Sequence, residues 1–156
     1  MKKFLAGLSL VVAGMSASAA DVYLVGGAAD FATNSAKEYG IGFGASKVFE
    51  NNVLIGIKAE VMVIDVDGVS DSYYGESVDL HLGYAYKDLS IYGIGTLTYH
   101  QLTNLNAYGF GGGAGLEYKL FKHLSIAAEY KSSSMTTAAD TTYDYSVARG
   151  LLKYKF

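Results

Sequence analysis

Apolar and polar or small side chains alternate with a period of two along most of the chain that follows residue 20. The clearest example is the last ten residues. One series there consists of Ala148, Gly150, Leu152, Tyr154 and Phe156, and the positions between them hold Val147, Arg149, Leu151, Lys153 and Lys155. Successive side chains of a β-strand point to opposite faces. This stretch therefore predicts a strand with one apolar face and one face that carries three cations.

The same alternation predicts eight strands. They cover residues 22–29, 39–46, 53–63, 77–86, 89–99, 108–118, 124–131 and 143–156. The facing of the first strand stays open, because small residues dominate it. In most of the others one face is apolar with tyrosines near the strand ends, and the opposite face carries charges, glycines and small polar residues. We therefore expect an all-β chain.

The connections between these strands alternate in length. Residues 49–52, 87–88 and 120–123 form tight polar turns, whereas 30–38, 65–76, 100–106 and 132–142 are longer and rich in Ser, Thr, Asn and Asp. Short periplasmic turns and longer external loops are typical of up-and-down transmembrane β-barrels. The pattern predicts an eight-stranded antiparallel barrel with both termini on the periplasmic side.

A soluble barrel or sandwich with the apolar faces packed inward is the alternative. Two features disfavour it. The first is that the apolar faces carry tyrosines near the strand ends. Tyrosine suits a boundary between water and hydrocarbon, because its ring is apolar and its hydroxyl is hydrated. The charged faces also carry rows of glycine, such as Gly109, Gly111, Gly113 and Gly115, which suit a narrow lumen. Tyr92 and Ile94, on the preceding strand, are expected to fill the space above these glycines.

The N-terminus has the pattern of a secretory signal peptide. A basic start at Lys2 and Lys3 precedes an apolar stretch over 4–15 and the small residues 16–20. Such a segment is too short and wrongly flanked for a spanning helix. We expect cleavage after Ala19 or Ala20, which divides the chain into a signal peptide (1–20) and one barrel domain (21–156).

Composition narrows the possible functions. Without residues 1–20, ten Lys and Arg remain against fifteen Asp and Glu, so the net charge is −5. A nucleic-acid binder needs a concentrated basic surface, so we expect no nucleic-acid partner. The chain has no cysteine and no proline. It therefore has no disulfides or thiol metal ligands, and it avoids a residue that paired strands tolerate poorly.

The charged residues on the inward faces are the main candidate site. They are Lys58, Glu60, Asp79, His81, Glu117, Glu129, Lys131, Arg149 and Lys153. An eight-stranded barrel is just wide enough for side chains to fill it, and buried charges must pair. We expect a structural network of ion pairs and hydrogen bonds that fills the lumen. A narrow gated path for water or ions is the alternative.

The chain resembles the small outer-membrane β-barrel family, of the OmpX type and the type of the OmpA membrane domain. The signal peptide, the strands 108–118 and 124–130 and the terminal residues 152–156 carry this resemblance. It implies a porin-like or structural protein of the Gram-negative outer membrane, exported through the periplasm. It also implies that Leu152, Tyr154 and Phe156 form the signal read by the β-barrel assembly machinery. Expected partners are periplasmic chaperones, outer-membrane lipid and lipopolysaccharide, with the protein itself a monomer.

Two other functions compete with this one. A surface adhesin would act through the external loops 65–76 and 132–142, with Tyr73 and Tyr74 as candidate contacts. A lipid-modifying enzyme would use His123 and Ser125, but a hydrolytic site needs its nucleophile and base within hydrogen-bond reach. His123 lies in a predicted periplasmic turn and Ser125 faces the lumen. We therefore expect no catalytic, cofactor or metal site.

Overall fold

The computed structural model describes residues 20–32, 34–69, 72–101 and 106–156. The predicted signal peptide falls almost wholly on residues 1–19, which lie outside this part of the chain. Within the described residues, no helix is long and apolar enough to cross a membrane.

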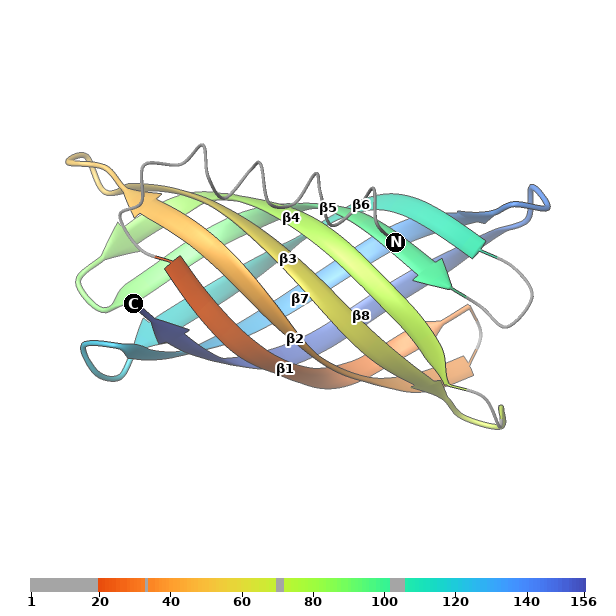
Figure 1. Cartoon of the computed structure of the whole chain (residues 1–156). Coiled ribbons are helices and arrows are strands. Elements are labelled where there is room, and N and C mark those ends of the chain that lie inside the picture. The colour runs from red at the N-terminus through yellow and green to blue at the C-terminus, as the bar shows by residue number, and fades with distance from the viewer. Residues whose placement is uncertain (1–19, 33, 70–71, 102–105) are drawn as a thin grey trace.

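Eight antiparallel strands close into one barrel, in which each strand pairs with its neighbours in sequence and β1 pairs with β8 (Figure 1). Their bounds are β1 Ala20–Phe31, β2 Asn34–Val48, β3 Val53–Val66, β4 Tyr73–Tyr86, β5 Leu89–Gln101, β6 Asn106–Lys119, β7 Leu124–Thr137 and β8 Thr142–Lys155. This confirms the predicted all-β, eight-stranded up-and-down barrel.

The two ends of the barrel differ in their connections (Figure 1). The turn end carries residues 49–52, 87–88 and 120–123, together with the start of β1 and the end of β8. The loop end carries the connections from β1 to β2, from β3 to β4, from β5 to β6 and from β7 to β8.

The loop-end connections are shorter than the sequence predicted, because the strands continue further. Residues 30–38 were expected to form a loop, but β1 and β2 pair as far as Phe31 and Asn34. Residues 132–137 belong to β7 and pair with β8 through Ser132–Ser146 and its neighbours. Serine and threonine at these positions satisfy the strand ladder as well as apolar residues do. The polar composition therefore marks the end of the apolar belt and does not mark the end of the strand.

The barrel is apolar outside and polar inside. Outward side chains such as Leu82 and Phe110 are 65% and 72% exposed, whereas inward Glu60 and Arg149 are 3% and 5% exposed. Hydrocarbon can solvate the outer face, while every backbone polar group of a closed barrel pairs with a neighbouring strand. The chain is therefore a transmembrane β-barrel. The soluble alternative, which needs an apolar interior, is wrong.

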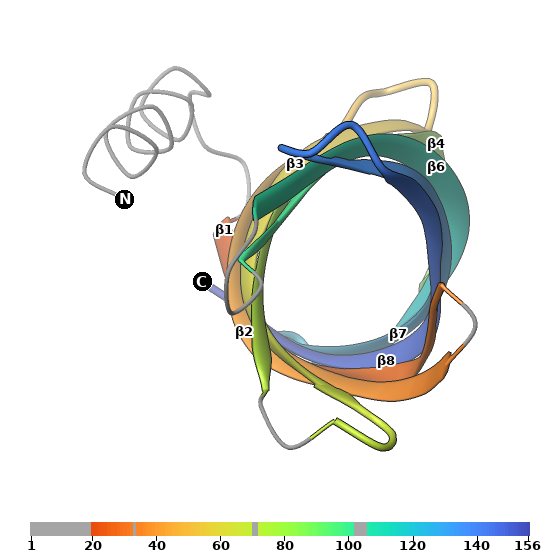
Figure 2. The same cartoon turned by 90° about the vertical axis from the view of Figure 1, so that its right-hand side faces the viewer.

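Figure 2 looks at the loop end and shows the closed ring of strands. Large inward side chains lie over inward glycines of neighbouring strands. A methyl group added at Gly42 would lie 2.3 Å from the Tyr23 ring, and one at Gly115 would lie 2.6 Å from the Tyr92 ring. The glycine rows therefore accommodate specific aromatic side chains. For Tyr92 this is the packing that the sequence predicted.

Candidate functional site

The middle of the lumen is organised around Arg149 of β8. Its two terminal nitrogens donate to both oxygens of Glu60, over 2.5 and 2.6 Å. Nη2 also donates to Glu129 over 2.7 Å, and Nη1 reaches Glu38 at 3.3 Å. The paired fork geometry with Glu60 is the strong, bidentate form of an arginine–carboxylate contact.

Two lysines complete this central layer. Lys131 of β7 donates to Asp79 over 3.0 Å and to Ser77 over 3.3 Å. Lys58 of β3 donates to Glu129. The four side chains Lys58, Glu129, Lys131 and Asp79 are each at most 4% exposed. Their partners come from different strands, so the ion pairs connect walls of the barrel that share no backbone ladder.

Three tyrosine hydroxyls also donate to these carboxylates. The hydroxyl of Tyr23 donates to Glu60 over 3.0 Å, and that of Tyr92 donates to Glu129 over 2.7 Å. Tyr145 donates to Glu38. Buried carboxylates are costly unless their lone pairs are satisfied. The tyrosine hydroxyls satisfy these lone pairs with neutral donors, and the tyrosine rings fill part of the lumen.

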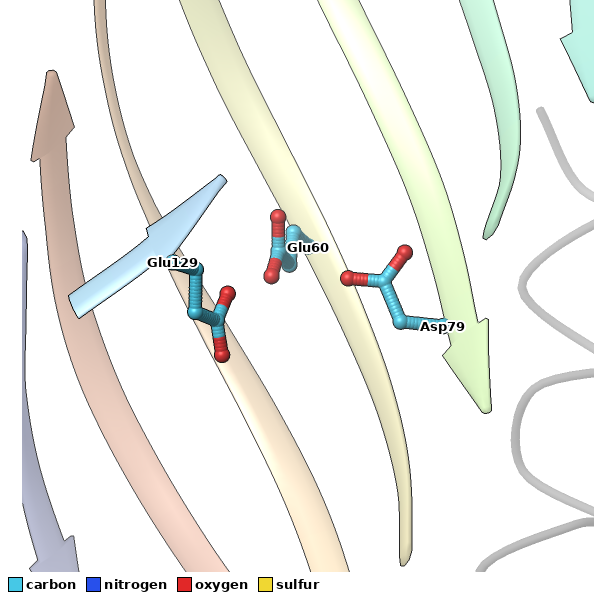
Figure 3. A group of neighbouring side chains, drawn as sticks. All are labelled: Glu60, Asp79 and Glu129. Carbon is cyan, nitrogen blue, oxygen red and sulfur yellow. The ribbon is translucent and has the colours of Figure 1, made fainter. Parts of the chain in front are cut away.

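Glu60, Asp79 and Glu129 point toward one another from β3, β4 and β7 (Figure 3). Each offers one oxygen, and these atoms lie within 4.8 Å of one another. Three carboxylates at this spacing resemble a hard-cation site. However, three cationic side chains, Lys58, Lys131 and Arg149, already pair with them. The cluster is neutralised by the protein's own cations, and we assign no metal to it.

A second, smaller charged cluster lies at the turn end. Lys153 pairs with Glu117 over 2.7 Å and with Asp21 over 3.4 Å. Lys155 pairs with the other Glu117 oxygen over 2.5 Å, and the hydroxyl of Ser125 donates to that same oxygen over 3.1 Å. This cluster closes the lumen between the Arg149 layer and the turn end.

His81 lies between the two charged clusters, where its ring stacks on Tyr92 with centroids 4.5 Å apart. Its Nε2 and the Oδ1 of Asp21 have no protein partner among the described residues. Both residues line a cavity of about 10 Å³. A space of that size accommodates a single water molecule, so this cavity is no ligand pocket.

The loop end of the lumen is filled by an aromatic plug, which we define as Phe31, Tyr73, His100, Tyr143 and Tyr145. The Phe31 ring centroid lies 4.9 Å from that of Tyr143 and 5.5 Å from that of Tyr73. The ring of His100 stands edge-on to Tyr145, and its Nδ1 lies 3.0 Å from the Tyr143 hydroxyl. Met135 and Ile64 pack in the same cluster and are fully buried.

The structure places all nine predicted lumen residues inside the barrel, each at most 7% exposed. Eight of them form ion pairs with one another or with Glu38, Asp21 and Lys155. His81 contacts this network by stacking on the ring of Tyr92. The alternating pattern did not indicate Glu38, because residues 30–38 were expected to form a loop. Asp21 was missed because the first strand was predicted to begin at Val22 and its facing was left open, whereas β1 begins at Ala20.

The aromatic plug was not predicted either. The sequence analysis assigned His100 to a loop, but this residue lies in β5 and is fully buried. Tyr73 was expected in an exposed loop, yet it lies in β4 and packs against Phe31. Its neighbour Tyr74 faces outward and is 62% exposed. Continuing the period of two from Leu97 would have placed His100 on the inner face.

The residues of the enzyme alternative do not meet. His123 lies in an exposed turn, where its Nδ1 donates to the backbone carbonyl of Lys155 over 2.8 Å. The Ser125 hydroxyl is buried and donates to Glu117. The residues of the expected assembly signal, Leu152, Tyr154 and Phe156, face outward and are 47%, 48% and 72% exposed.

No protein-family model matches the chain, and no curated protein matches it in sequence. Among solved structures, Neisserial surface protein A (NspA) is similar with a TM-score of 0.57 and 13% identity, over 88% of this chain and 96% of NspA. OprG from Pseudomonas aeruginosa gives 0.44 and 16%, over 90% and 97% of the two chains. OmpT of Vibrio cholerae gives 0.40 and 13%, over 87% and 52%. At this level of identity the likeness to NspA shows a shared fold.

Proposed function

We propose that the chain is a structural barrel of the Gram-negative outer membrane, with a lumen that is closed to steady ion flow. The filled interior carries this proposal. Three consecutive layers occupy the lumen: the Lys153–Glu117 cluster, the Arg149 network and the aromatic plug. A small barrel packed in this way has no continuous aqueous path. Its partners are the surrounding phospholipid and lipopolysaccharide, and it acts as a monomer without enzymatic activity.

Planar-bilayer recordings test the closed lumen. Purified protein is folded into lipid, and its heat-modifiable gel migration verifies that the barrel has formed. We expect no large, stable openings from the folded protein. A steady conductance that scales with the amount of inserted barrel would overturn the proposal and favour a gated path through the lumen.

Export through the periplasm belongs to the same proposal. It is supported by the signal-peptide pattern of residues 1–20 and by the outward apolar series Leu152, Tyr154 and Phe156. Comparing the mass of the mature protein from outer-membrane fractions with that of the full chain tests it. Cleavage after Ala19 or Ala20 is the expected result, and an uncleaved N-terminus in that fraction contradicts it.

The loops through which the protein could recognise another surface are shorter than the sequence predicted. Only residues 67–72 connect β3 to β4, and Tyr73 points into the lumen. Exposed Tyr74 remains the best contact candidate. Replacing residues 67–72 by a short Gly–Ser turn and Tyr74 by alanine tests this role, and unchanged adhesion of the cells to host or abiotic surfaces excludes it. For the enzyme alternative, an unchanged lipid profile in the His123→Ala/Ser125→Ala variant is the expected result.

A further inference from the structure

Charged side chains that lie outside the lumen are sorted by sign between the two ends of the barrel. Among the described residues, the loop end carries one cation, Lys37, and a set of acids: Asp30, Asp65, Asp67, Glu76, Asp140 and Asp144. The turn end carries the acids Glu50 and Asp88 and four exposed lysines: Lys47, Lys87, Lys119 and Lys122. We call these four lysines the turn-end collar.

The collar runs around the rim, because each of the three turns contributes to it. Lys47 precedes the turn 49–52, Lys87 lies within the turn 87–88, and Lys119 and Lys122 flank and occupy the turn 120–123. Ion pairs satisfy every lumen lysine, but none of the ion pairs among the described residues includes a collar lysine. Their ammonium groups are therefore available to an external anion.

The collar also lies at the boundary of the apolar belt. The Nζ of Lys47 lies 5.3 Å from the centroid of the Phe49 ring, and that of Lys87 lies 5.3 Å from the centroid of Tyr86. Phe49 and Tyr86 are 42% and 60% exposed, and Phe121 in the third turn is 70% exposed. Girdles of aromatic residues flank the apolar band of transmembrane barrels at both membrane interfaces. The neighbouring ammonium groups therefore lie at the depth of lipid phosphates.

From this juxtaposition we propose that the turn-end collar binds the headgroups of anionic glycerophospholipids in the leaflet that it contacts. The proposal rests on the membrane setting of the proposed function. A phospholipid matches the surface in two ways. Its acyl chains cover the apolar belt, and its phosphate meets an ammonium group that forms no ion pair with a carboxylate of the described residues. The acidic loop end repels the same lipids. The barrel therefore prefers the orientation in which its turn end faces the anionic phospholipid leaflet.

Lipid retention in native mass spectrometry tests this proposal. The protein is folded into vesicles of equal parts phosphatidylcholine and phosphatidylglycerol, extracted in mild detergent, and analysed for bound lipid. We expect enrichment of phosphatidylglycerol over phosphatidylcholine on the wild type. Each lysine near an anionic surface contributes about fivefold in affinity. The variant Lys47→Gln/Lys87→Gln/Lys119→Gln/Lys122→Gln should therefore lose the enrichment by about tenfold or more.

A matched control changes four charges at the opposite end: Asp30→Asn/Asp65→Asn/Asp140→Asn/Asp144→Asn. It should show at least the phosphatidylglycerol enrichment of the wild type, because it keeps the collar and removes acids that repel this lipid. Equal enrichment in the lysine variant and the wild type would overturn the proposal, as would equal loss in both four-site variants. Raising the salt concentration during extraction from these vesicles gives a second measurement that needs no mutation. Exposed charge contacts are screened over about 10 Å at 0.1 M salt, so enrichment that is insensitive to salt also counts against the collar.

These outcomes are independent of the closed lumen. A conducting wild-type barrel that retains phosphatidylglycerol would refute the proposed function and leave the collar standing. A closed barrel without lipid preference would refute the collar proposal and leave the proposed function standing.

Discussion

At the scale of single residues, Arg149 has the largest set of partners in the lumen. Its guanidinium contacts carboxylates from four strands: Glu38 of β2, Glu60 of β3, Asp79 of β4 and Glu129 of β7. A planar group with five donors in fixed directions can serve several carboxylates at once, whereas an ammonium group acts as a compact point charge. The position therefore requires arginine in particular, and a positive charge alone is insufficient.

Replacing Arg149 by glutamine should destabilise the folded barrel by about 3–5 kcal/mol, because it leaves buried carboxylates without their main partner. Arg149→Lys should recover only part of this loss. Urea unfolding in phospholipid vesicles measures the effect, followed by circular dichroism because the chain has no tryptophan. Lys37→Gln, at an exposed position, is the control and should change stability by at most about 0.5 kcal/mol. Full tolerance of Arg149→Gln would contradict a dry, paired interior.

A substitution at Leu80 tests whether the outer face of the barrel contacts hydrocarbon. It lies in the middle of β4, opposite Ile57 and Gly95, and is 63% exposed. Leu80→Arg should cost about 2–4 kcal/mol, which is the range for a cation at the bilayer midplane. Leu89→Arg, at the turn end of β5, should cost about 0–1 kcal/mol, because it lies near the interface. Equal effects of both variants on unfolding in vesicles would argue against a hydrocarbon environment around Leu80.

At the scale of strands, the shape of the lumen depends on pairing large side chains with glycine on adjacent strands. Gly115 of β6 lies opposite Tyr92 of β5 and Glu129 of β7. An added methyl group there would lie 2.6 Å from the Tyr92 ring and 2.9 Å from Cγ of Glu129. The glycine thus allows the tyrosine to reach the carboxylate to which it donates.

Gly115→Val should therefore displace Tyr92 and cost about 1–3 kcal/mol, the usual range for overpacking. Gly95→Val on the outer face of β5 is the matched control, because a methyl group there has no atom within 4 Å. Gel migration of the folded form and urea unfolding compare the two. If Gly95→Val proved the more disruptive variant, the interior packing assigned to Gly115 would be wrong.

The strands also show what an alternating pattern can and cannot predict. It placed Lys58, Glu129 and Arg149 on inward faces, because facing follows from position along one strand. It could not show that Arg149 meets Glu38, because these residues lie 111 positions apart and their contact depends on the stagger of the closed barrel. It ended the strands too early at the loop end, where the outer face carries serine and threonine. For the same reason it missed the plug around His100.

At the scale of the whole molecule, three layers lie in series in the lumen: the Lys153–Glu117 cluster at the turn end, the Arg149 network and the aromatic plug. The Arg149 network occupies the middle and the aromatic plug occupies the loop end. An ion that passes the plug still meets a layer in which cations and carboxylates neutralise each other. Resistances in series add, so removing one layer leaves the other two to block the path.

Combining substitutions in these layers tests this arrangement. The plug variant Phe31→Ala/Tyr143→Ala and the network variant Glu60→Gln/Arg149→Gln should each stay closed in planar bilayers. The network variant removes one cation and one carboxylate together, so the net charge of the lumen is unchanged, and Glu38, which loses its cation, keeps the hydroxyl of Tyr145 as a donor. Only a variant that combines both sets with Glu117→Gln/Lys153→Gln, which removes the ion pair of the turn-end layer, should show frequent ion-conducting openings. Conductance in the plug variant alone would mean that the Arg149 network and the turn-end layer are hydrated enough to pass ions, and the lumen would then have a single gate at its loop end.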